Sequence, residues 1–281
     1  MVRLGTLGKT LFFGAIVLYI LVPMMAVLLY SFSARWTSHM FPDAYTLQHW
    51  RDALTEERMQ QAVWRTTWMA FAVLLLDVAL VVPAVYWQRV RNPRIRIAME
   101  VSAAIPFVLP FVVIAFGILK LVGRTYPQLI GTPLIIWLGH TAIAFPFLYW
   151  AVDGAMAAAN VARLNEAAQT CGAGPFLILR HVVLPNITGG LAAGGMLVFA
   201  TSFGEFALVQ ILAGANFENV SLYSFSLLTQ TKSESEKLAV LTIITFVVLF
   251  AVSVGVVYVN RGQMANRVLP GARMAVAEKD R

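Results

Sequence analysis

The sequence predicts an all-α integral membrane protein with six transmembrane helices. Of its 281 residues, 59% are hydrophobic and 12% are charged, and the mean hydropathy is +0.74. A soluble domain is about 25% charged, so this chain has too few charged side chains to cover a soluble surface. The single cysteine, Cys171, excludes an internal disulfide. The third observation is a series of long apolar stretches, which are taken in order below.

Six stretches are long enough to cross a bilayer core, which takes about 20 apolar residues per helix. The first follows Arg3 and Lys9, as a signal peptide would, but its apolar run is long and no clear cleavage site follows. We therefore expect a retained helix there. The sixth stretch, like the first, contains no charged residue. The six expected spans are 11–30, 62–87, 98–122, 131–152, 187–213 and 238–259.

The distribution of basic residues predicts the orientation of these spans. With the N-terminus inside, the inner segments carry 13 of the 21 Lys and Arg residues and the outer segments carry 7. An excess of basic residues marks the cytoplasmic side, so both termini are expected in the cytoplasm. The net charge of +7 is then explained by the excess of basic residues in the cytoplasmic segments. Membrane lipid, and no nucleic acid, is the partner that this charge implies.

The connection at 153–186 differs in composition from the others. Residues 155–168 are rich in alanine and other helix formers. Gly172, Gly174 and Pro175 break this helix, residues 176–183 are expected to form a second short amphipathic helix, and Pro185 marks the turn into the fifth span. Composition leaves open an interfacial hairpin that only connects two membrane helices.

The spacing within this hairpin resembles the cytoplasmic signature of ABC-transporter permease subunits, E-A-A-x3-G-x9-I-x-L-P. Valine in place of isoleucine is the one departure. The matching residues are Glu166, Ala167, Ala168, Gly172, Val182, Leu184 and Pro185. The resemblance implies a type I ABC importer permease, in the bacterial inner membrane, of the polyamine, phosphonate or sulfate-like group. It covers most of the chain, since the signature precedes the fifth of six helices.

The resemblance also implies roles for the signature residues. The hairpin would be a coupling helix that docks into a groove on an ATP-binding subunit. Ala167 and Ala168 would allow close approach, Glu166 would offer a carboxylate, Gly172 would turn the chain, and Pro185 would end the second short helix.

The implied partners are a dimer of ATP-binding subunits, a second and different permease subunit, and an extracytoplasmic solute-binding protein. ATP and Mg would be bound by the partner, and this chain would hold no cofactor.

The residues themselves indicate no enzyme chemistry. The phosphate-binding pattern G-x4-G-K-[S/T] does not occur, and the 4 histidines show no metal-ligand spacing. We therefore predict no catalytic residue and no metal ligand. A self-sufficient secondary transporter or channel is the alternative function, but it would show repeated halves and would leave the signature unexplained.

Three acidic residues lie within or beside the apolar stretches, where ionisable groups are costly. Glu100 fits an interfacial charge near a helix N-terminus. Asp77 fits a buried structural group better than a solute contact, and it would pair with Arg65 only if the fold brought them together. For Glu205, lining the path and hydrogen bonding between helices are equally supported. Asp77 and Glu205 are the candidate translocation-path residues.

Three further patterns add detail. Residues 41–50 (FPDAYTLQHW) resemble a segment of permeases for polyamines and phosphonates, and the outer loop 31–61 is expected to form a short helix along the membrane surface. Gly204-Glu205-Phe206 resembles the equivalent stretch of sulfate and molybdate permeases. Gly190 and Gly194 permit close helix packing, either within this chain or against a second permease.

Overall fold

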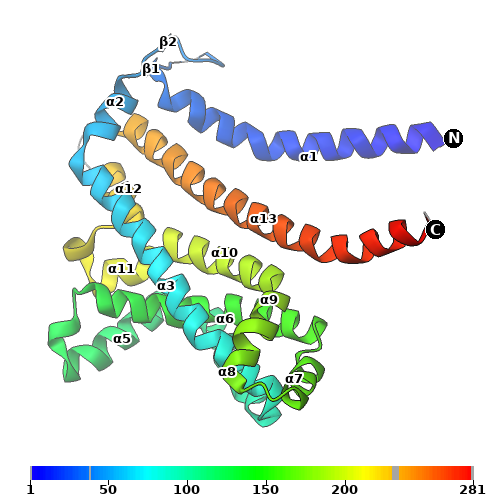
Figure 1. The fold of residues 1–281 in the computed structure, drawn as a ribbon. Helices are drawn as coiled ribbons and strands as arrows, with labels where there is room; N and C mark the ends of the chain where they lie inside the picture. The colour runs from blue at the N-terminus through cyan, green and yellow to red at the C-terminus, as the bar shows by residue number, and fades with distance from the viewer. Residues whose placement is uncertain (1, 38, 230–233, 280–281) are drawn as a thin grey trace. The chain divides into compact units, whose positions relative to one another are not determined.

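The computed structural model describes residues 2–37, 39–229 and 234–279, with side chains described between residues 8 and 258 (Figure 1). Lys232 and Arg281, which entered the charge count, lie outside the described residues. Four helices are long and apolar enough to cross a membrane alone, and two bent helix pairs raise the number to as many as six. The predicted all-α membrane fold is confirmed.

The chain forms two compact units, one of residues 1–63 and 223–248 and the other of residues 64–222 and 249–281. In the first unit, α1 (Val2–Ser31) is followed by an antiparallel hairpin of β1 (Ser33–Arg35) and β2 (Ala44–Tyr45) and then by α2 (Gln48–Thr55). The unit also contains most of α12 (Val220–Thr229) and the start of α13 (Ser235–Lys279).

The outer loop is more structured than expected, because a β-hairpin precedes the short helix. Trp50 of α2 stacks on Phe32 with ring centroids 5.4 Å apart, and its indole N–H donates to Ser31 Oγ at 3.2 Å. His49 Nε2 lies 3.0 Å from the carbonyl oxygen of Ser33, within hydrogen-bond distance. These contacts fix α2 against the end of α1, so Trp50 packs on the chain itself, whereas Phe41 and Tyr45 are each 60% exposed.

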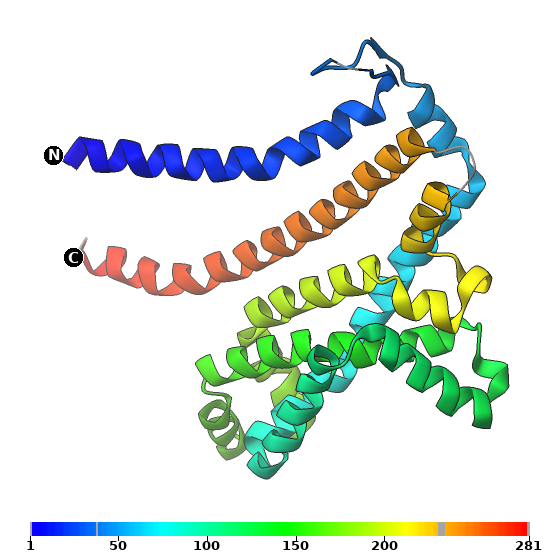
Figure 2. The same cartoon turned by 180° about the vertical axis from the view of Figure 1, so that it is seen from behind.

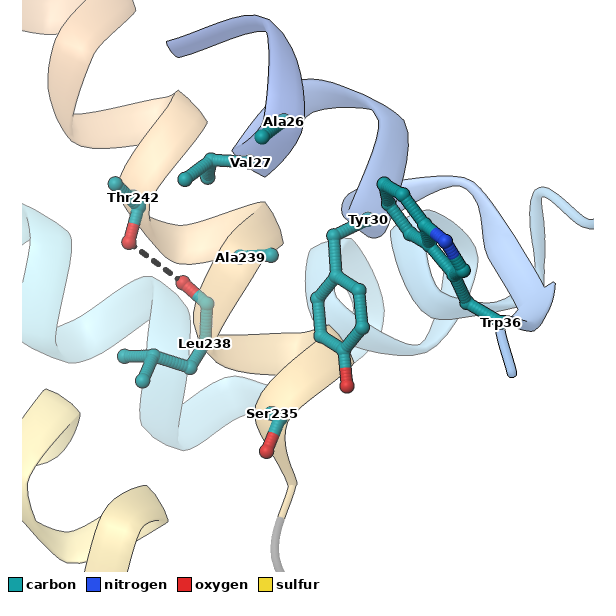
Figure 3. Close-up of a pocket in the computed structure, with 8 residues that line it drawn as sticks. All are labelled: Ala26, Val27, Tyr30, Trp36, Ser235, Leu238, Ala239 and Thr242. Atoms are coloured by element: carbon teal, nitrogen blue, oxygen red, sulfur yellow. Dashed lines mark hydrogen bonds between the residues drawn. The ribbon is translucent and has the colours of Figure 1, made fainter. Parts of the chain in front are cut away.

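A groove of about 530 Å³ lies between α1 and the start of α13 (Figure 3). Tyr30 and Trp36 form one wall, and Leu238 and Ala239 form the other. The Tyr30 hydroxyl donates to Glu236 at 3.3 Å, and the Thr242 hydroxyl donates to the carbonyl of Leu238 at 2.8 Å. Because these hydroxyls are engaged and the rest of the lining is mostly apolar, with Ser235 as the other hydroxyl, the groove offers little to a polar solute.

Glu56 joins three elements of the first unit. Its carboxylate accepts a hydrogen bond from the Tyr223 hydroxyl at 2.7 Å and lies 2.9 Å from Lys237 Nζ, which also pairs with Glu234 at 2.6 Å. Burial raises the pKa of Glu56, but hydrogen bonds from Lys237 and Tyr223 and the nearby charges outweigh it and hold the pKa below its ordinary 4.5. The charged carboxylate therefore stabilises the fold.

Glu56→Gln is expected to lower the free energy of unfolding by about 1 kcal/mol at neutral pH. Because the folded-state pKa is lowered, the charged form stabilises fully above pH 4.5, and this contribution is lost as the pH falls through the folded pKa. Denaturant unfolding in detergent between pH 3 and 7 measures the difference. Glu57→Gln, on the exposed neighbour, is the control, and a gap between wild type and Glu56→Gln that did not shrink in acid would contradict the assignment.

The second unit is a helical bundle. It begins within α3 (Glu57–Val90) and continues through α4 (Arg96–Val108), α5 (Phe111–Thr125) and α6 (Pro133–Ala158). The hairpin elements α7 (Val161–Thr170), α8 (Pro175–Ile178), the π-helical turn Leu179–Val183 and α9 (Leu184–Asn186) follow. After them come α10 (Thr188–Gly204) and α11 (Ala207–Leu212). Short 3-10 turns lie at Pro93–Ile95, Pro127–Leu129 and Gly214–Phe217.

The core of this unit is built around α6, whose Ile136, Leu148 and Tyr149 are fully buried. Helix α10 lies alongside α6 in both views (Figures 1 and 2). A Cβ on Gly194 would lie 2.8 Å from Ala151 Cβ, and one on Gly190 would lie 2.7 Å from the Ala151 carbonyl oxygen. The two glycines therefore serve helix packing within this chain.

Two expected spans are interrupted in the structure. The stretch 98–122 divides into α4 and α5, and the chain bends by 108° between them. The break falls at Leu109 and Pro110 because the residue before proline is driven out of the helical region, and Leu109 is extended with ψ 130°. The stretch 187–213 divides at Glu205 into α10 and α11, and Val220–Thr229, which had been assigned to an outer loop, is a further short helix.

The expected helix at 176–183 also differs, since its second half is a π-helical turn. Pro185 lacks an N–H for the preceding turn, and its ring crowds the carbonyl four residues earlier, which favours a widened turn there. Pro185 itself lies within α9, and not at the turn into the fifth span as expected. The sharp bend, 81°, comes between Pro175–Asn186 and Thr188–Gly204.

Candidate coupling surface and intramembrane polar groups

Helix α7 presents a small, polar surface. Val161 and Asn165 point inward and are 1% and 4% exposed. Glu166 and Ala167 are exposed, and Ala168 is half-buried. This is the spacing of an amphipathic helix with one buried stripe. The signature therefore places a carboxylate and a methyl group on the outward face, where a partner can approach closely.

The signature glycine ends α7. Gly172 adopts φ +80°, a left-handed conformation that favours glycine. Its N–H donates to the carbonyl of Gln169 at 2.9 Å, and the N–H of Ala173 donates to the carbonyl of Ala168 at 3.1 Å. These two bonds satisfy two of the last carbonyls of the helix. The signature fixes the number of residues between Glu166 and Gly172. In the structure this spacing separates the exposed glutamate of α7 from the glycine at the end of the same helix.

The return arm of the hairpin is anchored by apolar residues next to the signature positions. Ile178 and Val183 are fully buried, and Ile187 is 1% exposed. Val182 and Leu184 are half-buried on either side of Val183, and Pro185 is exposed. Val183 and Ile187 therefore pack the return arm against the bundle, while Glu166 and Ala167 of α7 are the signature residues exposed on the first arm.

A polar clamp of Gln88, Arg89, Asp153 and Tyr149 joins the end of α3 to α6. Arg89 Nε and Nη2 donate to the two carboxylate oxygens of Asp153 at 2.7 and 2.6 Å, and Gln88 Nε2 donates to Asp153 at 3.1 Å. The Tyr149 hydroxyl donates to Gln88 at 3.2 Å. Bidentate Arg–carboxylate pairs are geometrically specific, so the clamp fixes α3 against the end of α6, just before α7.

A second bond ties the same end of α3 to α7 itself. The Tyr86 hydroxyl donates to Asn165 Oδ1 at 2.6 Å, and both side chains are buried. Tyr86, Arg89, Asp153 and Asn165 were not among the candidate residues of the sequence. The signal that was present is the cluster of polar residues at the last turn of a long apolar helix.

Glu205 lies at the break between α10 and α11. Its carboxylate accepts the backbone N–H of Leu208 at 2.9 and 3.1 Å and that of Val209 at 3.4 Å. A carboxylate that binds the free N–H groups at a helix start also opposes the positive end of the helix dipole. Glu205 is 5% exposed, so in this structure it stabilises the break between α10 and α11.

His140 of α6 lies beside this carboxylate. Its Nδ1 is hydrogen-bonded to Ser202 Oγ at 2.8 Å, and its Nε2 is 3.5 Å from Glu205 Oε2, close enough for an ion pair but without hydrogen-bond geometry. The side-chain amide of Asn219 donates to the carbonyl of Glu205 at 2.8 Å. Three elements thus converge on one buried polar group, and His140 was not among the candidate residues of the sequence.

Asp77 is fully buried on α3, between Val73 and Val81 along the same inward stripe. Neither carboxylate oxygen has a hydrogen-bond partner among the described residues. Arg65 lies twelve residues earlier on the same helix, about 18 Å along the axis at 1.5 Å per residue. The pairing with Arg65 therefore does not form, and Asp77 lines a cavity instead.

Residues 78–264 match the model of a family described as "Binding-protein-dependent transport system inner membrane component". The chain belongs to this family. It is accordingly the inner-membrane permease subunit of an ABC importer, a multi-pass transport subunit rather than an enzyme. The resemblance read from the hairpin signature is confirmed.

Relatives of this permease carry different substrate names. It is 29% identical to the molybdenum transport permease ModB of Mycobacterium tuberculosis, over 72% of this chain and 80% of that protein. It is 23% identical to PhnV of Salmonella typhimurium, named for 2-aminoethylphosphonate transport, over 79% and 82%. It is 28% identical to y4fN of Sinorhizobium fredii over 76% of this chain, which spans only 39% of that relative's length.

Two solved importers share the fold. A bacterial ABC transporter that imports the polysaccharide alginate aligns with a TM-score of 0.67 at 15% identity, over 89% of this chain and 94% of that one. The methionine transporter MetNI aligns with a TM-score of 0.60 at 18% identity, over 74% and 99%. At these identities the likeness establishes the fold alone.

Proposed function

We propose that this permease lines half of a translocation path for a small polar solute and is driven by a separate dimer of ATP-binding subunits. ATP and Mg bind to those partners, a second and different permease completes the path, and an extracytoplasmic binding protein delivers the solute. Both chain termini lie in the cytoplasm. The names of the relatives and the resemblances noted above favour a polyamine, a phosphonate or an oxyanion.

The observation that carries the proposal is the exposed face of α7. A coupling element must be accessible to the partner and rigidly joined to the membrane helices. Glu166 and Ala167 are exposed, while Asn165 on the opposite face is bonded to Tyr86 of α3. A push on α7 is therefore transmitted to α3 and α6 rather than absorbed within a loose connection.

Glu166→Lys is expected to reduce solute-stimulated ATP hydrolysis by roughly tenfold in the reconstituted importer, because it reverses the charge offered to the partner. Folding should be unaffected, since the side chain is exposed. Steady-state ATP turnover with and without the binding protein measures the effect.

Asp52→Lys makes the same change of charge on an exposed residue of α2 and is the matched control. If Glu166→Lys retained full stimulation, α7 would not be the coupling surface. If both variants lost it equally, the loss would report net charge instead.

A further inference from the structure

A cavity of about 750 Å³ lies in the second unit, with walls from α3, α4, α5 and α6. Most of its lining is aliphatic, for example Val81, Ile105 and Val113. Its polar lining residues are Asp77, Ser102 and Thr141. The cavity thus combines apolar walls with a few oxygen atoms, the composition of a small-molecule site.

Two of these polar groups are buried without a partner. Asp77 is 0% exposed and Thr141 is 8% exposed. Both carboxylate oxygens of Asp77 and the hydroxyl of Thr141 lack a hydrogen bond within the described residues. Buried polar groups are almost always satisfied, because an unsatisfied one is costly. Two on neighbouring helices, lining the same space, indicate that a group from outside the chain completes them.

The charge of the site determines which group that is. No Lys, Arg or His lines the cavity, and Lys120 of α5 is exposed and is not part of the lining. An oxyanion would meet the Asp77 carboxylate with no basic residue to offset the repulsion. A cation with N–H donors would satisfy both acceptors, and its attraction to the carboxylate is strengthened by the low local dielectric.

We propose that this cavity holds the primary ammonium group of an organic amine. Asp77 provides the counter-charge, Thr141 accepts a further N–H, and the aliphatic part of the amine lies against the apolar walls. The assignment rests on the proposed function in taking the amine as part of the transported solute, and it narrows that solute to molecules that carry a primary amine.

Equilibrium dialysis of radiolabelled n-butylammonium against the full chain in detergent tests the site. We expect saturable binding of one amine per chain, weakened roughly tenfold or more in Asp77→Asn, a change of nearly the same shape that removes the charge and replaces one acceptor oxygen by an N–H donor. Glu100→Gln is the control, because Glu100 lies on α4, pairs with Arg96 at 2.8 Å and does not line the cavity. It should bind the amine as the wild type does.

Competition on the wild-type chain keeps the test independent of how the variants fold. Unlabelled n-butylammonium should displace the label, whereas butan-1-ol and butane-1-sulfonate, which share its alkyl chain, should not. Equal displacement by butan-1-ol would show an apolar groove only, and displacement by the sulfonate, or no binding at all, would overturn the proposal. The binding assay contains no ATP-binding subunit. Its outcome is therefore independent of the Glu166→Lys test of coupling, and failure of one proposal can be told from failure of the other.

Discussion

Gly190→Leu is expected to unfold much of the protein or to prevent its accumulation in the membrane. A Cβ at this position would overlap Ala155 Cβ and lie 2.7 Å from the Ala151 carbonyl oxygen. The carbonyl belongs to the backbone of α6, so relief requires α10 to move away from α6. Overpacking of this kind costs about 3 kcal/mol or more, a large part of the stability of a domain. Unfolding in detergent, followed by tryptophan fluorescence, measures the loss.

Gly189→Leu provides the matched control, because it is the adjacent residue of the same helix and a Cβ there meets nothing within 4 Å. The two variants share the change in composition and in helix propensity, and they differ in the face that carries the new side chain. If both lost stability to the same extent, close packing of α10 on α6 would not be the cause.

The fold class followed from the sequence because the bilayer sets the length of each helix. Long apolar runs without internal breaks, such as those in α1 and α13, were located well. The breaks within the spans were not, because they depend on local chemistry within apolar runs. The break at Leu109 depends on the proline that follows it, and the break at Glu205 needs the carboxylate to reach the N–H groups of the next helix.

The candidate site divides in the same way. The hairpin signature identified the exposed residues of α7 because their spacing is local. The residues that hold α7 in place were missed because their partners are remote: Tyr86 and Asn165 are 79 positions apart, and Arg89 and Asp153 are 64 apart. Asp77 of α3 and Thr141 of α6 line the same cavity, and this is likewise a property of the packed bundle.

Asp153→Ala is expected to lower the free energy of unfolding by about 2 kcal/mol and to impair coupling. The change leaves Arg89 without its bidentate partner, and the side chains of the pair are only 23% and 13% exposed. An unpaired charge in a partly buried site loses its compensation. Because Asp153 lies five residues before the end of α6, the loss also loosens the segment that carries α7.

A double-mutant cycle of Arg89→Ala and Asp153→Ala separates the pair from other effects. Residues in direct contact show interaction free energies of roughly 0.5–3 kcal/mol, so the double variant should lose little more than the more damaging single one. Glu100→Ala is the comparison, because it breaks the exposed Arg96–Glu100 pair, whose side chains are 57% and 47% exposed and which should contribute little to stability.

The same variants distinguish anchoring from simple stability. If the clamp positions α7, Asp153→Ala should lose solute-stimulated ATP hydrolysis at temperatures where it is fully folded, and Glu100→Ala should keep it. Strict additivity of the two single changes, or full stimulation in folded Asp153→Ala, would show that α7 is held by its apolar contacts and by the Tyr86–Asn165 bond alone. The coupling surface would then depend on the buried face of α7, and not on the charge pair at the end of α3.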